Sequence, residues 1–158
     1  MIWTWAVRHD KGGAGLTQTN TAAVQYLEGI DRAKGTGTPP SIEVWRKNGA
    51  EAERLTPEAL ARSGDVVQLR YIVPTSCYGA VMSVDGRGAL TVHLSGDSGK
   101  AAPLKSGRPI ALSDAYQLDD APLFETFYLV TAKDNFDIES VKRSLPEDGL
   151  ITAFTLKK

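Results

Sequence analysis

Alternation between apolar and polar residues is the main structural signal in this chain after position 40. Runs with a period of two are typical of strands that bury one face. Turn-forming residues, mainly glycine, proline, asparagine and aspartate, separate these runs. The predicted strands cover 42–47, 66–73, a hairpin over 79–95, 108–118, 124–131 and 150–156. Short strands at this spacing predict a mostly β fold, an antiparallel β-sandwich with one or two short helices.

The hairpin is defined well enough for its register to be predicted. A three-residue loop over 86–88 would pair Val84 with Leu90 and Met82 with Val92. A two-residue loop would divide these large apolar side chains between the two faces. We therefore expect the three-residue loop, with one continuous apolar face.

Turn chemistry agrees with this loop. Asp85 would occupy the first position of a type I turn, and Gly88 would take the left-handed position that follows it. In this register His93 lies on the opposite, polar face of its strand. We expect that face to be the outer one.

Two short helices are predicted. Thr56-Pro57-Glu58 is typical of an N-cap followed by proline at the first helical position, giving one or two turns up to Arg62. Asp137 would cap a second helix whose Ile138, Val141 and Leu145 lie on one face, and Pro146 would end it. A polar loop is expected between the hairpin and the strand at 108–118.

The first part of the chain carries weaker signals. The apolar run over 1–7 is too short to span a bilayer, and 11–20 has the composition of a flexible linker. The segment 22–32 is ambiguous between a helix and a strand. We expect residues 1–24 to form an N-terminal segment and residues 25–158 to form the β-sandwich domain.

Charge and cysteine content exclude several classes of protein. The formal net charge is −1 and no block of Lys and Arg exists, so a sequence-independent nucleic-acid binder is disfavoured. Attraction to an anionic membrane surface is disfavoured for the same reason. The single cysteine, Cys77, cannot form an intramolecular disulfide or a multi-cysteine zinc site. We expect it to be a small packed residue.

One motif resembles a nucleophile sequence. Gly96-Asp97-Ser98-Gly99 matches the segment that carries the serine of chymotrypsin-like proteases. The histidine motif of that family is absent, because Lys133 follows Thr131-Ala132 where the histidine would fall. The segment is therefore predicted to be a polar turn, and no catalytic residue is assigned.

Acidic residues cluster in the sequence around the turn that joins the predicted strands at 108–118 and 124–131. Asp119, Asp120 and Glu125 lie close together, with Tyr116 just before them. Their spacing matches no calcium-binding loop, and aspartate is also an ordinary turn residue. We treat these four residues as the candidate partner or ligand surface, and we assign neither a metal nor a cofactor.

Several stretches, in this order, resemble a known bacterial domain. They are Arg32-Ala-Lys-Gly35, Ile42-Glu-Val-Trp-Arg46, Gly64-Asp65, Tyr78-Gly-Ala-Val-Met-Ser-Val-Asp-Gly-Arg-Gly88, Thr91-Val-His-Leu94, Tyr116-Gln-Leu-Asp-Asp-Ala-Pro122, Phe124-Glu-Thr-Phe-Tyr-Leu-Val-Thr-Ala132 and Phe136. The domain is an uncharacterised one of unknown function, often found after a transmembrane helix in anti-sigma-factor-like envelope proteins.

The resemblance implies that residues 1–24 are a juxtamembrane segment and that the domain faces the periplasm. It implies a membrane link only through a helix upstream of this sequence. The expected function is a non-catalytic sensory or protein-interaction domain with a protein partner in the envelope. The resemblance also implies a link to sigma-factor regulation, although the zinc-binding region of some relatives is absent from this sequence. A small-molecule or glycan-binding β-sandwich and a hydrolase are the alternatives.

Overall fold

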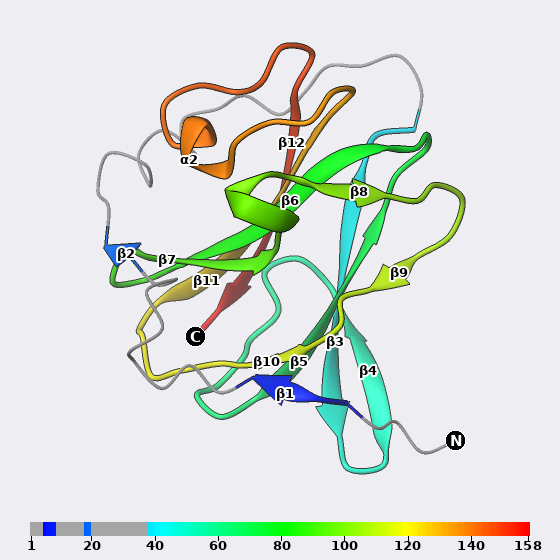
Figure 1. Ribbon diagram of the computed structural model, residues 1–158. Helices are drawn as coiled ribbons and strands as arrows, with labels where there is room; N and C mark the ends of the chain where they lie inside the picture. Colours follow the sequence, from blue (N-terminus) through cyan, green and yellow to red (C-terminus); the bar gives the residue numbers. More distant parts are fainter. Residues whose placement is uncertain (1–4, 9–17, 20–37) are drawn as a thin grey trace.

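Two layered β-sheets form the protein, as a computed structural model shows (Figure 1). The structure describes residues 5–8, 18–19 and 38–158. Apart from one two-residue parallel pair, all neighbouring strands in these sheets are antiparallel. The prediction of a mostly β, sandwich-like fold is confirmed, and the helical content is one short helix and one 3-10 turn.

Sheet A contains the strands that the pattern at 42–47 and 66–73 predicts. Its order is β1-β10-β5-β3-β4, and β9 also pairs with β5. Asn48 and Gly49 turn the chain between β3 and β4, with Gly49 at a φ of 62°. The strands are β1 (Val7–Arg8), β3 (Ser41–Asn48), β4 (Glu51–Leu55), β5 (Val66–Ile72), β9 (Ile110–Ala111) and β10 (Ala115–Gln117).

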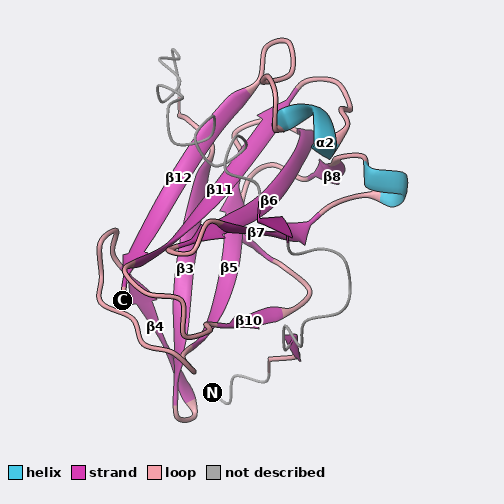
Figure 2. Cartoon of the chain, turned by 90° about the vertical axis from the view of Figure 1, so that its left-hand side faces the viewer, coloured by secondary structure: helices cyan, strands magenta, loops and turns pink. Residues whose placement is uncertain are grey.

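Sheet B contains the hairpin and the last two long strands, which lie side by side in Figure 2. Its order is β12-β11-β6-β7-β2, and β8 also pairs with β6. The strands are β2 (Gln18–Thr19), β6 (Cys77–Asp85), β7 (Ala89–Leu94), β8 (Ala102–Leu104), β11 (Phe124–Ala132) and β12 (Leu150–Lys157).

The hairpin has the predicted register. Val84 pairs with Leu90 and Met82 with Val92. The Gly88 N–H donates to the Asp85 carbonyl over 2.9 Å, and the φ of Gly88 is +80°. Three residues, 86–88, therefore connect β6 to β7. The loop could be predicted because Asp85 and Gly88 each occupy the turn position that their residue type favours.

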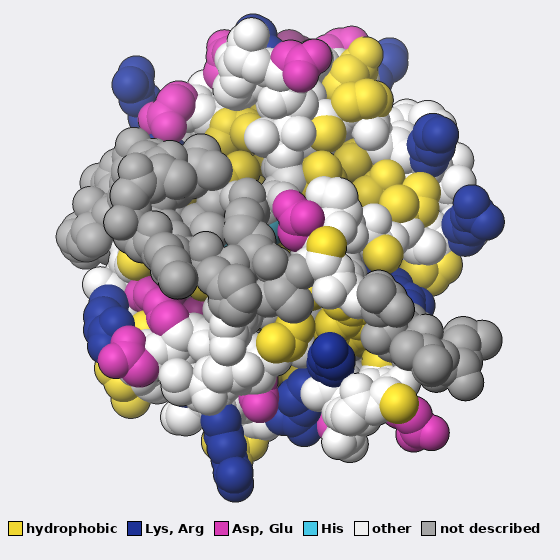
Figure 3. All heavy atoms as spheres, turned by 60° about the horizontal axis from the view of Figure 1, so that its bottom comes forward, with side chains coloured by type: hydrophobic (Ala, Val, Ile, Leu, Met, Phe, Trp, Pro, Cys, Tyr) yellow, Lys and Arg dark blue, Asp and Glu magenta, His cyan; other side chains and the backbone are white. Residues whose placement is uncertain are grey.

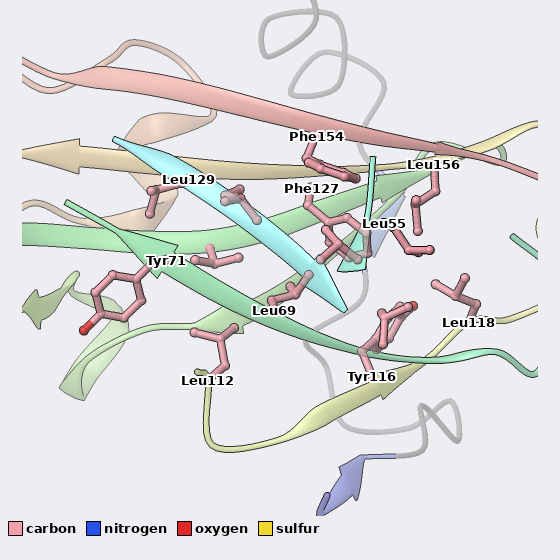
Figure 4. Packing of buried hydrophobic residues seen from close by; sticks show 14 of the residues in the cluster. Leu55, Leu69, Tyr71, Leu112, Tyr116, Leu118, Phe127, Leu129, Phe154 and Leu156 are labelled. Carbon is pink, nitrogen blue, oxygen red and sulfur yellow. The ribbon is translucent and has the colours of Figure 1, made fainter. Parts of the chain in front are cut away.

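Apolar side chains cover both faces of sheet B. Phe127 and Leu129 point into the space between the sheets, where they face Leu69 and Tyr71 (Figure 4). The other face carries Met82, Val84, Leu90, Tyr128 and Val130, which belong to a second apolar cluster. Residues that cover this second face include Phe136, Ile138 and Val141.

A short helix after Asp137 is confirmed as α2 (Ile138–Val141), with Ile138 and Val141 buried, but it ends at Val141 and does not continue to Pro146. The Asp137 side chain makes no cap hydrogen bond and instead forms an ion pair with Lys100 over 3.0 Å.

The helix predicted from Thr56 to Arg62 is wrong. Glu58 has a φ of +69°, which a right-handed helix does not allow. The N–H groups of Glu58 and Ala61 donate to the carbonyls of Thr155 and Lys157, over 2.8 and 2.7 Å. Pairing with the end of β12 therefore overrides the local capping signal.

Two predictions after the hairpin need correction. The strand expected over 108–118 is divided into β9 and β10, and Leu112 and Tyr116 in this stretch are both buried. The loop expected before it contains β8, which pairs with β6 across Gly79. A Cβ at Gly79 would collide with the Leu104 side chain, so glycine permits this close approach.

The N-terminal segment contributes one two-residue strand to each sheet. β1 pairs with β10 and β2 pairs with β7. Most of the linker expected over 11–20 and all of the ambiguous segment 22–32 lie outside the described residues.

Candidate functional site

A hydrogen-bonded chain of three polar side chains lies at one end of the space between the sheets. Ser83 of β6 donates from Oγ to Glu125 Oε1 of β11 over 2.8 Å. The Nε2 atom of His93, on β7, lies 2.8 Å from the same Ser83 Oγ. Ser83 and Glu125 are each only 1% exposed. Three neighbouring strands of sheet B thus bring together side chains up to 42 positions apart.

His93 faces sheet A, so the predicted outer position of this residue is wrong. Its ring makes an edge contact with Tyr116 of β10, at 4.6 Å between centroids, and lies 5.7 Å from the Phe127 ring. The apolar face of the hairpin is turned to the second cluster instead. The alternation was therefore predicted correctly, but the face that meets the other sheet was not.

Burial dominates the electrostatics of Glu125. It raises the pKa of this carboxyl from 4.5 to about 7. The hydrogen bond from Ser83 and the charge of Lys158 lower the pKa, whereas the charges of Asp119 and Asp85 raise it. Glu125 Oε2 has no hydrogen-bond partner among the described residues. The carboxyl is thus poised between its two protonation states near neutral pH.

Lys158 binds the acidic turn, residues 119–123, and also contacts the Glu125 carboxyl. Its Nζ donates to Asp119 Oδ1 over 3.0 Å and lies 3.4 Å from Glu125 Oε2. Its backbone N–H donates to the Leu123 carbonyl over 3.0 Å. The Lys158 side chain is 6% exposed, so one buried residue contacts both ends of the 119–123 turn, Asp119 through its ammonium group and Leu123 through its backbone N–H.

Asp120 points to a different partner. Its carboxylate accepts a hydrogen bond from Arg87 Nη1, in the hairpin loop, over 2.8 Å. This hydrogen bond and the Arg87 charge lower the pKa of Asp120. The same loop approaches the turn closely at Gly86, where a Cβ would collide with the Pro122 carbonyl oxygen. The hairpin loop and the acidic turn are therefore packed together.

Leu123 is the most exposed large apolar residue among the described part of the chain, at 68%. Its φ is +75°, a region that leucine rarely adopts. It lines an open hollow of about 370 Å³ on the outer face of sheet B, together with Glu58, Phe124, Thr126, Thr155 and Lys157. Within this lining, Thr126 of β11 pairs with Thr155 of β12, and their hydroxyl oxygens lie 2.9 Å apart.

The structure connects three of the four predicted site residues. Glu125 and Asp119 share Lys158, and Tyr116 reaches Glu125 through His93 and Ser83. Asp120 lies at the exposed edge and pairs with Arg87. Sequence reasoning missed the roles of Ser83, His93, Lys158 and Leu123. A serine or glutamate within strongly apolar strands was the available signal for a buried polar site.

The protease-like motif does not join this chain. Ser98 lies in the 3-10 turn Asp97–Gly99 with a φ of 55°, and the prediction of a turn is confirmed. The His93 Nε2 contacts Ser83 instead. Ser83 is the middle member of its chain, whereas a catalytic triad places the histidine between the serine and the carboxylate.

Other chemistry is limited in the described ranges. Cys77 is half-buried against the inner core, and burial raises the pKa of its thiol. The described residues include no group of three or more His, Cys, Asp or Glu that could hold a metal ion. Within those ranges, no helix has the length and apolar character needed to cross a membrane. Acidic and basic side chains are interspersed on the face shown in Figure 3.

Comparison with known proteins gives no relative: no family model matches the chain, and neither a curated protein nor a solved structure matches it significantly.

Proposed function

We propose that this protein is a non-catalytic protein-interaction domain of a bacterial envelope protein. Leu123 is the observation that carries the proposal, because it is exposed and held in a strained backbone conformation. Strain of this kind costs about 1–3 kcal/mol and persists where the surroundings enforce it, often at functional sites. The envelope setting and the sensory role come from the sequence resemblance alone.

The surroundings of Leu123 enforce its conformation from both sides. Its carbonyl accepts the hydrogen bond from the Lys158 N–H, and the next residue, Phe124, donates from its N–H to the Pro122 carbonyl over 2.9 Å. Pro122 in turn packs against Gly86. A leucine that only filled space could adopt an ordinary conformation, so its presentation to solvent supports a role in binding.

The partner that this surface suits is an extended protein segment with one apolar anchor side chain. The hollow beside Leu123 has room for one or two side chains rather than for a whole helix. Along the same face of sheet B, the chain's own Phe136 and Ile138 already pack as apolar anchors. A partner segment would continue this packing toward the β11–β12 end, between the Leu123 side chain and the Glu58–Lys157 ion pair.

Site-directed photocrosslinking tests this proposal. A photoreactive amino acid replaces Thr155 in the lining of the hollow, and the protein is irradiated in envelope extract. We expect one crosslinked partner peptide with an apolar anchor, identified by mass spectrometry and then synthesised. Burial of a leucine-sized anchor contributes about 1.5–3 kcal/mol. Leu123→Ser should therefore weaken binding of that peptide at least tenfold.

Leu60→Ser is the matched control. Leu60 is 63% exposed and lies opposite Lys157, but it lines a different hollow. This variant should bind the peptide as the unmodified protein does. Equal binding by Leu123→Ser, or equal losses in both variants, would contradict the proposed surface.

A further inference from the structure

The geometry points to a proton-controlled latch, in which Glu125 sets whether the 119–123 turn stays closed over the end of the sandwich. This inference concerns regulation of the surface at Leu123, so its biological meaning rests on the proposed function. The latch itself is a property of the isolated domain. It can be tested without any partner.

Glu125 and the turn are connected through one side chain. Lys158 Nζ lies between Asp119 and Glu125, and the Lys158 backbone is bonded to Leu123. Opening of the turn would remove Asp119 and Lys158 from the carboxyl and admit water to Glu125 Oε2. That oxygen lacks a hydrogen bond among the described residues, so the ionised form gains most from opening.

The signs of the surrounding charges agree with this direction. Asp119 on the turn and Asp85 on β6 repel a negative Glu125, and Lys158 attracts it. Desolvation outweighs that attraction and keeps the proton on Glu125 up to a pH of about 7, the value to which its pKa is raised. A closed turn therefore favours protonated Glu125, and loss of the proton favours the open turn.

Ser83 gives the proton a route to the carboxyl. His93 is half-buried, and its ring also contacts Tyr116 on β10. An imidazolium at His93 can pass its Nε2 proton to Ser83 Oγ while Ser83 passes its own proton to Glu125 Oε1. The products are a neutral imidazole protonated at Nδ1 and a neutral carboxylic acid. Two protons shift, the net result is the transfer of one proton from His93 to Glu125, and the serine hydroxyl is regenerated with its direction reversed.

Nuclear magnetic resonance of the isolated domain tests the latch. We would record the Glu125 carboxyl signal, the His93 ring signals and hydrogen exchange of the Ala121 and Lys158 amides between pH 5 and pH 9. Exchange rates are corrected for their intrinsic pH dependence. Protection of both amides should fall on the order of tenfold as Glu125 ionises, because the open turn no longer has the charge-assisted hydrogen bond from Lys158 to Asp119.

Variants separate the parts of the latch. Glu125→Gln should keep both amides protected across the whole range. Lys158→Met and Ser83→Ala should each raise the midpoint of the Glu125 titration, because each removes a group that lowers its pKa. Asp120→Asn is the control within the turn, since Asp120 pairs with exposed Arg87, and it should leave the protection change intact.

Two results would overturn the latch. One is constant protection of Ala121 and Lys158 while the Glu125 signal titrates. The other is an unchanged loss of protection in Glu125→Gln. Either result leaves the photocrosslinking test of the Leu123 surface unaffected, and failure of that test leaves the latch standing.

Discussion

The space between the two sheets is filled differently at its two ends. At one end, Leu69, Tyr71 and Leu129 pack as an apolar core. The Tyr71 hydroxyl oxygen there accepts a hydrogen bond from the Lys105 N–H over 3.4 Å. At the other end, Ser83 and Glu125 are equally buried, and their polar atoms are bonded mainly to each other and to His93.

The difference indicates what each end contributes. Burial of apolar surface stabilises the fold by about 25 cal/mol for each Å² removed from water. A buried carboxyl with one oxygen lacking a hydrogen bond among the described residues costs stability. Because this buried carboxyl does not stabilise the fold, the polar end is where we look for function.

Truncation at the apolar end should have the largest effect. Leu129 is fully buried between the sheets. Leu129→Ala should reduce the free energy of unfolding by about 2–5 kcal/mol, because it removes a buried side chain and leaves a cavity. Urea denaturation at constant pH measures this change. A loss well below 1 kcal/mol would mean that this end is not the well-packed core that its burial indicates.

The polar end should make stability depend on pH. The pKa of Glu125 is raised from 4.5 to about 7, so the folded protein retains a proton that the unfolded chain loses in this range. The contribution of this retained proton to the free energy of unfolding is complete below pH 4.5 and is lost as the pH rises to about 7. Linkage makes the difference about 3 kcal/mol.

Glu125→Gln isolates this effect. The stability of the unmodified protein relative to the variant should fall by about 3 kcal/mol between pH 4 and pH 8, as measured by denaturation at a series of pH values. Titration of all other groups is common to both proteins and cancels. A difference that stays constant with pH would show that Glu125 ionises at its ordinary pKa.

Much of the strand arrangement could be predicted because it depends on local signals. Alternation located β5, β11 and β12, and the Asp85–Gly88 turn fixed the register of the hairpin. Alternation defines two faces but does not say which one meets the other sheet. Residues 136–141 cover the apolar face of the hairpin, so the polar face could turn inward. His93 was misplaced for this reason.

The candidate site was predicted only in part, because its partners come from distant strands. Asp119 and Glu125 were identified from an acidic cluster in the sequence. Their shared cation, Lys158, lies at least 33 positions further along the chain, and no local pattern links them. The exposed side chain and positive φ of Leu123 depend on its hydrogen bond with Lys158 and on the contact of Pro122 with Gly86. Only the folded structure brings these residues together.

A single side chain organises the hairpin loop at the polar end. Asp85 Oδ1 accepts hydrogen bonds from the N–H groups of Arg87 and Ala89, over 2.8 and 3.0 Å. Asp85→Ala should therefore lower the free energy of unfolding by about 1–2 kcal/mol. Asp85→Asn keeps an acceptor and should cost less than Asp85→Ala. Thermal unfolding distinguishes the two, and equal losses would assign the effect to charge rather than to the turn.

The smallest effect is expected at the exposed rim of the same end. Arg87 and Asp120 form an ion pair at 2.8 Å, but both side chains are more than half exposed. Solvent and salt screen such pairs, so Arg87→Ala should leave thermal unfolding unchanged within error, at low and at high salt. Its backbone N–H still donates to Asp85 in this variant. A clear destabilisation by Arg87→Ala would mean that the rim, and not only the buried Lys158 contacts, holds the turn against the hairpin. The division between an exposed edge and a buried latch would then have to be redrawn.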